Sequence, residues 1–305
     1  MNKPLLKVMI DRGNFVDESR TFEGDARKIP YKFYYPEGGA PKKPLIVWSH
    51  GLGGTRDGAG YIARFLAAHD YCLLHIQHRG TDSSLWEGKP GHPWDNIRKT
   101  KITRSITLDR YRDVPFVLDH LNEIERSHII DTKRIGMSGH SFGALTTQVM
   151  CGQLFPDRHE NHISLRDDRF VAGMLYSFVA MGHLFSGDPS VLFEPMDKPL
   201  FFMTGTDDGN PVDEVDYTFR MPVWENAGAK EKYLLLLEDG DHMVYNGSRG
   251  KLEDNPKREL HEKIICEASL LFWDMKLKGD KQAEEKLRSG AYNEALGDEA
   301  TLTVG

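Results

Sequence analysis

Short runs of apolar residues alternate along the chain with stretches in which apolar side chains recur at helical spacing. Uninterrupted runs of this length are typical of strands covered on both faces, and such strands form largely parallel sheets. Six runs predict strands over Pro44–His50, Tyr71–His78, Arg134–Gly139, Phe170–Phe178, Pro199–Thr204 and Tyr233–Leu237. The more alternating segment Tyr31–Tyr35 predicts an antiparallel strand at the sheet edge, with Leu5–Ile10 as a candidate partner.

Helical periodicity between these runs predicts amphipathic helices. The first is marked by Val114, Val117, Leu118, Leu121 and Ile124, and the last by Leu260, Ile264, Ala268, Leu271, Phe272 and Met275. The alternation of strands and helices predicts a doubly wound α/β fold, in which a mostly parallel sheet has helices on both faces. No repeat or linker marks a boundary, so residues 1–305 are expected to form a single domain without a large cap domain.

Two long connections, Gly80–Ile106 and Ala180–Lys198, follow predicted strands. Connections of this length are usually functional or disordered. Both are rich in aromatic and other apolar side chains, which argues against disorder. Since loops that leave the carboxyl ends of parallel strands open onto one edge of the sheet, both are expected to lie beside the candidate site.

The net charge of −7 disfavours a nucleic-acid partner, because phosphates require a concentrated basic surface. No segment approaches the ~20 uninterrupted apolar residues of a membrane span. Three cysteines cannot all pair, and each lies in an apolar stretch, as buried free thiols do. We therefore expect a cytoplasmic protein; secretion stays open, since a signal removed ahead of Met1 would leave no trace.

The candidate nucleophile is Ser141, at the centre of the G-x-S-x-G motif Gly139–Gly143. The motif follows a predicted strand and precedes a predicted helix. A sharp strand-to-helix turn lifts the serine hydroxyl above the sheet, and the crowding at such a turn requires very small residues two positions to either side. The N-terminus of the following helix also favours negative charge there.

A glycine-rich segment, His50–Gly54, ends the first of the six predicted strands, Pro44–His50. Glycines allow the backbone to turn sharply and to approach a substrate oxygen closely. The backbone N–H groups of Leu52 and Phe142 are therefore predicted to form an oxyanion hole.

The candidate acid and base follow two later strands. One strand ends in Asp207 and Asp208, and the next ends in a segment that contains His242. The order serine, aspartate, histidine is that of α/β-hydrolases. His242 would take the serine proton, and an aspartate would orient the imidazole. The spacing alone leaves both aspartates open.

No metal or cofactor is expected. His159, Glu160 and His162 form the densest group of possible ligands, but they lack the H-E-x-x-H spacing and a clear third ligand.

Five motifs together resemble the α/β-hydrolases, namely WSHGLGG, HRGTD, GHSFGA, GTDDG and DGDHM. More narrowly they resemble the platelet-activating-factor acetylhydrolase-like and predicted dienelactone hydrolase-type carboxylesterases, to which cutinase-like polyester hydrolases are related. The resemblance covers roughly residues 29 to 279. It implies Ser141 as nucleophile, Asp208 as acid, His242 as base, and Leu52 with Phe142 as oxyanion donors. Dienelactone hydrolases use a cysteine nucleophile, so Ser141 argues against a dienelactone substrate.

The expected activity is hydrolysis of uncharged, fairly apolar carboxylic esters through an acyl-enzyme, with a small-molecule ester as the partner. The side chains expected to line an acyl pocket are Trp48, Trp86, Trp94, Phe185, Phe193 and Tyr245. Alternatives are a lipase-, phospholipase- or polyester-type hydrolase of the same fold. A serine peptidase is disfavoured because there is no room for a large additional domain, and a non-catalytic binding protein is disfavoured by the complete set of catalytic residues.

Overall fold

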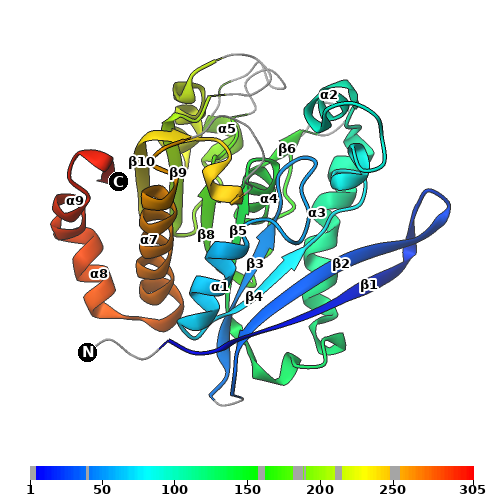
Figure 1. Ribbon diagram of the computed structural model, residues 1–305, viewed down its shortest axis with the longest axis horizontal. Coiled ribbons are helices and arrows are strands. Elements are labelled where there is room, and N and C mark those ends of the chain that lie inside the picture. The colour runs from blue at the N-terminus through cyan, green and yellow to red at the C-terminus, as the bar shows by residue number, and fades with distance from the viewer. Residues whose placement is uncertain are drawn as a thin grey trace.

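The computed structural model describes residues 5–38, 41–156, 162–180, 188, 190–209, 215–247 and 255–305 (Figure 1). Within these residues one mixed sheet has the strand order β1-β2-β4-β3-β5-β8-β9-β10-β11. Its strands are β1 (Val8–Phe22), β2 (Asp25–Pro36), β3 (Lys43–Ser49), β4 (Cys72–Ile76), β5 (Ile130–His140), β8 (Phe170–Tyr176), β9 (Leu200–Asp207), β10 (Lys232–Asp241) and β11 (Ala300–Val304). A separate small ribbon pairs β6 (Phe155–Pro156) with β7 (His162–Ile163).

The six central strands, β4, β3, β5, β8, β9 and β10, pair in parallel. They coincide with the six predicted apolar runs, apart from small differences at their ends. The edge strands pair antiparallel, β1 with β2 and β10 with β11. The β1–β2 hairpin is much longer than the pattern predicted, and its tip extends beyond the body of the sheet (Figure 1).

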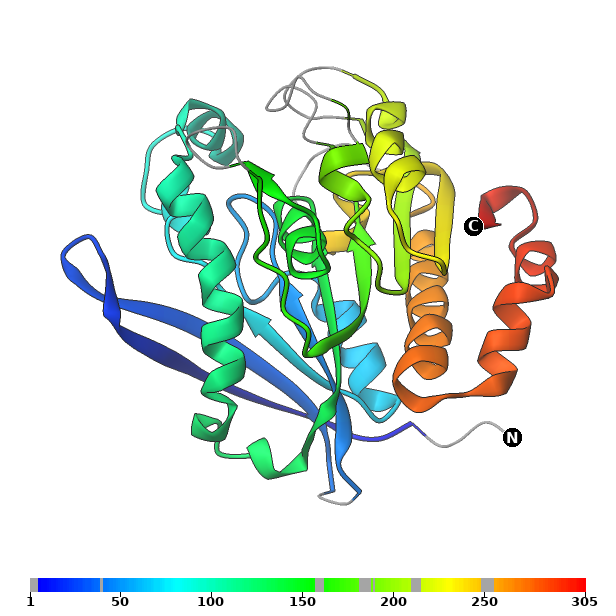
Figure 2. The same cartoon turned by 180° about the vertical axis from the view of Figure 1, so that it is seen from behind.

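Helices cover both faces of the sheet. The helices of the described residues are α1 (Gly60–Ala68), α2 (Pro93–Lys99), α3 (Arg104–Asp119), α4 (Phe142–Met150), α5 (Ser190–Phe193), α6 (Met221–Asn226), α7 (Arg258–Lys278), α8 (Lys281–Arg288) and α9 (Ala291–Leu296). Helices α1 and α7 lie on the face seen in Figure 1, and α3 and α4 lie on the face seen in Figure 2. No helix among the described residues is long and apolar enough to cross a membrane.

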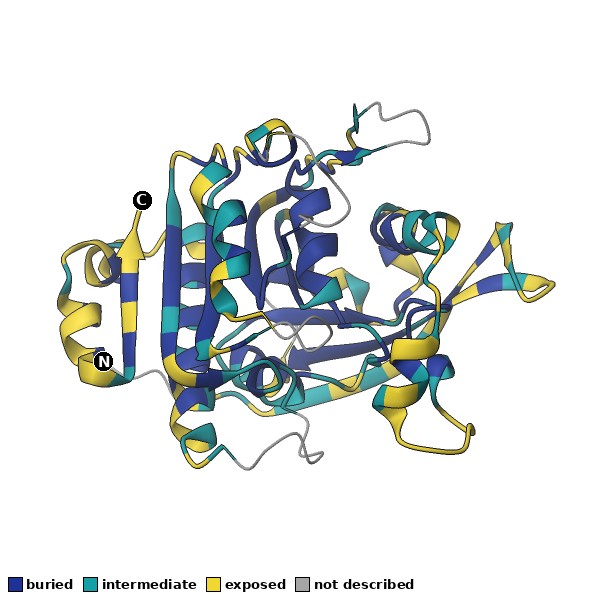
Figure 3. Cartoon of the chain, turned by 90° about the horizontal axis from the view of Figure 1, so that it is seen from above, coloured by how far each residue is buried: buried dark blue, intermediate teal, exposed yellow. Residues whose placement is uncertain are grey.

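The core has one hydrophobic cluster on each side of the sheet. In β3, Leu45 and Val47 pack toward α3 and α4, whereas Ile46 and Trp48 pack toward α1 and α7. Successive strand residues point to opposite faces, so covering both faces buries the whole strand. Figure 3 shows this concentration of buried residues in the central strands, with exposed residues on the outer helices and the hairpin tip.

Candidate active site

Ser141 lies at the turn between β5 and α4. Its backbone has φ 56° and ψ −118°, a region that residues with a side chain rarely adopt, so the turn is strained. The Ser141 N–H donates to the carbonyl of Tyr176 at 2.9 Å. This geometry is that of the predicted sharp turn, and it leaves Ser141 half-buried at the carboxyl end of the sheet.

Two glycines allow the turn to form. A Cβ atom on Gly143 would lie 1.8 Å from the backbone oxygen of Ser49, and one on Gly139 would lie 2.3 Å from the backbone oxygen of Gly143. Because the contacts are with backbone atoms, no side-chain rotation relieves them. The start of α4 is therefore packed directly against the end of β3.

Asp208 and His242 form a hydrogen-bonded pair at the ends of β9 and β10. The imidazole Nδ1 lies 2.7 Å from Asp208 Oδ1, which requires Nδ1–H to donate to the carboxylate. The second carboxylate oxygen accepts hydrogen bonds from the hydroxyls of Thr204 and Ser177. Asp208 is fully buried and Asp207 is exposed. The geometry thus pairs Asp208, and not its neighbour, with the histidine.

Arg220 is a member of this group that sequence reasoning missed. Its Nη2 donates to Asp208 Oδ1 at 2.7 Å, and its Nε donates to the backbone oxygen of Asp208 at 3.1 Å. Its Nη1 donates to the carbonyls of Phe178 and Ser177, at 2.6 and 3.2 Å. The only local signal for burial is the apolar surrounding sequence, YTFRMPVW; nothing in the spacing assigns Arg220 to Asp208.

The Arg220 guanidinium determines the charge state of the buried acid. Burial by itself raises the pKa of Asp208. The charges of Arg220 and His242, with hydrogen bonds from His242 and Ser177, outweigh this effect and hold the pKa below its ordinary value. Asp208 is therefore ionised at neutral pH and can stabilise a positive charge on the imidazole.

His140 connects the turn that carries Ser141 to the segment that carries His242. Its Nε2 donates to the backbone oxygen of His242 at 2.7 Å, and the two imidazole rings have centroids 4.7 Å apart. Burial, together with the charge of His242, lowers the pKa of His140 to about 3, so this ring is neutral. The contact brings the two segments together at the same edge of the sheet.

The glycine-rich loop after β3 lies against Ser141. A Cβ on Gly51 would be 3.4 Å from Ser141 Cβ. The loop is held by hydrogen bonds from Gly53 N–H to Thr81 O, at 2.8 Å, and from Gly54 N–H to Gly51 O, at 3.0 Å. Within the described part of the chain the N–H groups of Leu52 and Phe142 have no hydrogen-bond partner, so both remain available to a ligand.

The structure corrects several of the expected pocket residues. Trp48 and Tyr245 are buried in the core beside α1 and α7, where each ring packs near Tyr176. Phe193, on α5, is buried in the opposite core cluster. All three have interior neighbours, because the strands and loops that carry them turn these rings toward the helices and not toward solvent. They pack the core and are not walls of an open pocket.

Trp86 and Trp94 are half-buried, and Phe185 lies outside the described residues. Trp86 borders a cavity of about 280 Å³, together with Gly53, Gly54, Thr55, Asp57, Gly58, Asn246 and Gly247. Its indole N–H donates to the carbonyl of Gly53 at 2.7 Å. This cavity lies between the glycine-rich loop and the segment that follows His242, and glycines and polar groups form most of its wall.

The group of possible metal ligands falls partly outside the described residues, since His159 and Glu160 are not among them. Within the described ranges, no cluster of three or more His, Cys, Asp and Glu side chains could hold a metal ion.

The chain was compared with protein families, with known proteins and with solved structures. No family model matches the chain. It is 29% identical over 137 residues to the platelet-activating factor acetylhydrolase of Canis lupus familiaris, covering 34% of this chain, and 28% identical over 137 residues to that of Bos taurus. The matched part spans 31% of each of these relatives.

A solved ferulic acid esterase from Streptomyces cinnamoneus has a TM-score of 0.64 at 18% sequence identity, covering 90% of this chain and 91% of its own. The predicted α/β-hydrolase fold is thereby confirmed, and so is the resemblance of part of the chain to acetylhydrolases.

The crowding around the serine turn predicts the effect of Gly143→Ala. Because the added methyl group would overlap the Ser49 carbonyl, the substitution should lower the free energy of unfolding by about 3 kcal/mol or more. Denaturant unfolding measures this. The control is Gly88→Ala. Its positive φ (74°) carries the ordinary strain of a side chain there, but no atom lies within 4 Å of the new Cβ, so it should cost much less. Equal stability of the two variants would contradict the proposed crowding.

The ion pair at Asp208 predicts a pH-dependent effect of Arg220→Gln. Removing one partner of a buried pair should cost about 3–5 kcal/mol at neutral pH. In the parent protein the depressed pKa of Asp208 stabilises the fold above the unfolded pKa, and this stabilisation is lost as the pH falls through the folded pKa. In the variant, burial raises that pKa, so acid relieves the penalty by protonating Asp208.

The difference in Tm between parent and Arg220→Gln should therefore narrow as the pH is lowered from about 7 to about 3. Thermal unfolding across this range tests it. Arg134→Gln removes a more exposed ion pair, to Asp131, and should change Tm little at any pH. A difference that stays constant or widens in acid would show that Arg220 does not act through the charge of Asp208.

Proposed function

We propose that this protein is a serine hydrolase that cleaves carboxylic esters, with Ser141 as nucleophile, His242 as general base and Asp208 as the acid of the triad. The observation that carries the proposal is the meeting of a strained serine turn with a buried, hydrogen-bonded Asp208–His242 pair at one edge of the sheet. The names of the relatives, an acetylhydrolase and an esterase, agree with a hydrolytic enzyme.

In the proposed mechanism His242 Nε2 accepts the hydroxyl proton of Ser141 as Oγ attacks the ester carbonyl carbon. The oxygen that becomes negative accepts hydrogen bonds from the N–H groups of Leu52 and Phe142. His242 then gives the proton to the departing alcohol, and an acyl-enzyme remains on Ser141. A water molecule repeats the sequence in the second half, releasing the acid and regenerating the serine.

The role of Asp208 follows from its contacts. Its hydrogen bond fixes the His242 tautomer in which Nδ1 carries the proton and Nε2 is free to accept one. Its negative charge stabilises the imidazolium that forms after proton transfer. Arg220 keeps the carboxylate ionised and in place, so it is a positioning residue for the acid.

For the substrate we propose an uncharged ester with a small acyl group. The cavity at Gly53 and Gly54 is lined by four glycines, Trp86 and the polar residues Thr55, Asp57 and Asn246, and it has room for a compact group. Rates with p-nitrophenyl esters of graded acyl length, measured beside a peptide panel and a phospholipid, separate this proposal from lipase, phospholipase and peptidase activities. Fastest turnover of short acyl esters supports it, and turnover confined to peptides would exclude it.

We further propose that the protein works in a reducing compartment such as the cytoplasm. Cys72, Cys151 and Cys266 are all buried free thiols, and burial raises the pKa of each to about 12. None of the three is paired, whereas proteins of oxidising compartments commonly hold their cysteines in disulfides.

The nucleophile assignment predicts that Ser141→Ala lowers kcat by a factor on the order of 10⁴ or more without loss of stability, since the triad acts as one unit. A fluorophosphonate should label Ser141 in the parent, as peptide mass spectrometry would show, and should not label the variant. Ser138→Ala is the matched control, since its buried hydroxyl only donates to the Val47 carbonyl. Labelling of a different serine would overturn the assignment.

The two adjacent aspartates provide a comparison within the chain. Asp208→Asn should lower kcat by several orders of magnitude, roughly 10⁴-fold, because the neutral amide does not hold His242 in the productive tautomer. Asp207→Asn changes an exposed side chain and should have little effect. Steady-state kinetics on one ester decides between them, and the opposite order of effects would make Asp207 the acid.

A further inference from the structure

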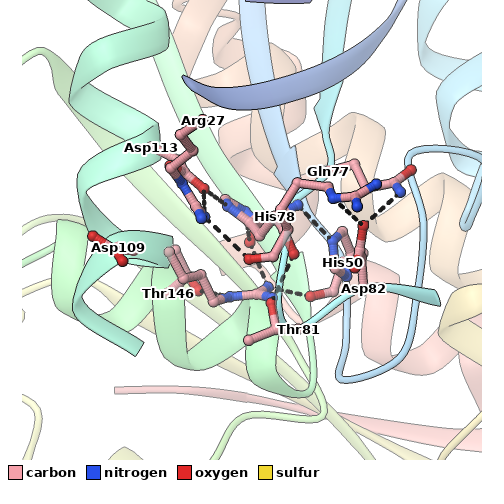
Figure 4. A network of polar contacts seen from close by, with 12 residues as sticks. Arg27, His50, Gln77, His78, Thr81, Asp82, Asp109, Asp113 and Thr146 are labelled. Atoms are coloured by element: carbon pink, nitrogen blue, oxygen red, sulfur yellow. Dashed lines mark hydrogen bonds and ion pairs between the residues drawn. The ribbon is translucent and has the colours of Figure 1, made fainter. Parts of the chain in front are cut away.

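A second network of buried polar side chains lies beneath the glycine-rich loop, on the α3 and α4 side of the sheet (Figure 4). At its centre is Arg110 of α3, which is fully buried. Its Nε donates to Thr146 Oγ1, its Nη1 donates to Thr81 Oγ1, and its Nη2 donates to Ser49 Oγ, each at 2.8 Å. Nη2 also donates to the backbone carbonyl of His50.

These contacts reach both halves of the proposed oxyanion hole. On one side, Arg110 holds the His50 carbonyl two residues before Leu52. It also holds the Thr81 hydroxyl, and the backbone oxygen of Thr81 accepts from the N–H of Gly53, one residue after Leu52. Arg110 thus holds the backbone on both sides of Leu52. It holds His50 directly, and it holds Gly53 through Thr81.

On the other side, Arg110 contacts the start of α4. The guanidinium lies over the ring of Phe142, with Cζ 4.5 Å from the ring centroid. Thr146, which accepts the hydrogen bond from Nε, in turn donates to the backbone carbonyl of Phe142 at 3.0 Å. One rigid planar group therefore spans the two segments that carry the Leu52 and Phe142 N–H groups.

The charge of Arg110 is balanced through a relay and not by a carboxylate in direct contact. Ser49 Oγ accepts from Arg110 and lies 2.9 Å from His78 Nε2, and His78 Nδ1 lies 3.0 Å from Asp113 Oδ2. Burial first, and then the charges of Arg110 and Arg27, lower the pKa of His78 far below its ordinary value. The ring is neutral, with Nδ1–H donating to Asp113 and Nε2 accepting from Ser49.

This relay repeats the order serine, histidine, aspartate of a catalytic triad, but it cannot supply a nucleophile. Ser49 is fully buried, and its oxygen already accepts a hydrogen bond from Arg110. Asp113 is also held by Arg27, whose Nε and Nη2 donate to the two carboxylate oxygens at 2.7 Å each. The network is closed to substrate and tied to the sheet, which suits a structural support.

We propose that Arg110 is a positioning residue that fixes the Leu52 and Phe142 N–H groups relative to each other and so preorganises the oxyanion hole. The inference rests on the proposed ester hydrolysis and assigns a role to a buried group that the triad does not use. A lysine offers a single nitrogen in place of the planar fork, so Arg110→Lys keeps the charge but cannot hold all four oxygens.

The first test compares Arg110→Lys with Arg27→Lys. Both replace a buried arginine of the same network. Among the described residues, however, Arg27 hydrogen-bonds to Asp113 and the Arg79 carbonyl and lies over the ring of Phe22, away from residues 50–54 and 142–146. Arg110→Lys should lower kcat about 10- to 100-fold with KM nearly unchanged, since small misplacement of preorganised donors costs that much. Arg27→Lys should leave kcat within about twofold of the parent value, even if it lowers Tm.

A thionoester substrate makes the readout specific for the oxyanion hole. It carries sulfur in place of the carbonyl oxygen, and sulfur accepts hydrogen bonds weakly. The ratio of kcat/KM for the ester to that for the matched thionoester should therefore fall in Arg110→Lys and stay unchanged in Arg27→Lys. The positioning role would be overturned if Arg110→Lys lowered kcat/KM equally for the ester and the thionoester. It would also be overturned if Arg27→Lys lowered the ester-to-thionoester ratio as much as Arg110→Lys does.

Amide hydrogen exchange supplies a readout that does not depend on turnover. Peptides covering residues 50–54 and 142–146 should exchange faster in Arg110→Lys than in the parent, and not in Arg27→Lys. If exchange changes in this way but the parent protein hydrolyses no ester, the proposed function fails, and the role of Arg110 in holding the loop stands. If exchange there is unchanged, the positioning role fails even in an active esterase.

Should Arg110→Lys fail to fold, Thr81→Val serves instead. It is nearly isosteric and removes only the hydroxyl that accepts from Nη1 and donates to the His78 carbonyl. It should produce a smaller change of the same sign in the ester-to-thionoester ratio and in exchange at residues 50–54. Absence of both changes in the folded variant would overturn the proposal.

Discussion

The close approach of α4 to the end of β3 leaves no room for a single methyl group, since a Cβ on Gly143 would overlap the Ser49 carbonyl. This contact fixes the turn that carries Ser141 against the loop that carries Leu52. It also forces Ser141 into a strained backbone conformation, which is maintained only because the surrounding core is well packed. The rest of the candidate site is arranged around this contact.

Two buried guanidinium groups support the site from opposite sides. Arg220 holds Asp208 and the backbone that follows β8. Arg110 holds the carboxyl end of β3 and the start of α4. Burying a guanidinium is costly unless each of its nitrogens finds a hydrogen-bond partner. Each of these arginines meets that condition with several oxygen atoms, so its removal would leave unpaired groups on more than one strand end. The two sides differ in charge balance: Arg220 contacts its carboxylate directly, whereas Arg110 reaches Asp113 only through Ser49 and His78.

The two arrangements suit different tasks. Direct contact keeps Asp208 ionised while leaving its Oδ1 hydrogen bond to His242 intact. The indirect contact leaves the Arg110 donors free for backbone and hydroxyl oxygens, which are the groups that define loop geometry. His140 then joins the two halves by donating to the His242 carbonyl from the residue before the serine. The site is therefore held by polar contacts made beneath it, and its N–H groups at Leu52 and Phe142 have no hydrogen-bond partner in the part of the chain that the structure describes.

The sequence by itself determined the six central strands, because strands buried on both faces require uninterrupted apolar runs. It also predicted a sharp turn at Ser141, since only very small residues fit on either side of such a turn, and it offered Asp207 and Asp208 as candidates for the acid. The tertiary structure decided what local pattern cannot encode: that Asp208 is the buried one, that Arg220 and Arg110 insert from distant segments, and that Trp48, Phe193 and Tyr245 pack into the core. An aromatic residue in an apolar stretch has the same signature whether it faces a pocket or a helix. No sequence pattern marks a buried arginine, because its hydrogen-bond partners lie on distant segments that only the folded sheet brings close to it.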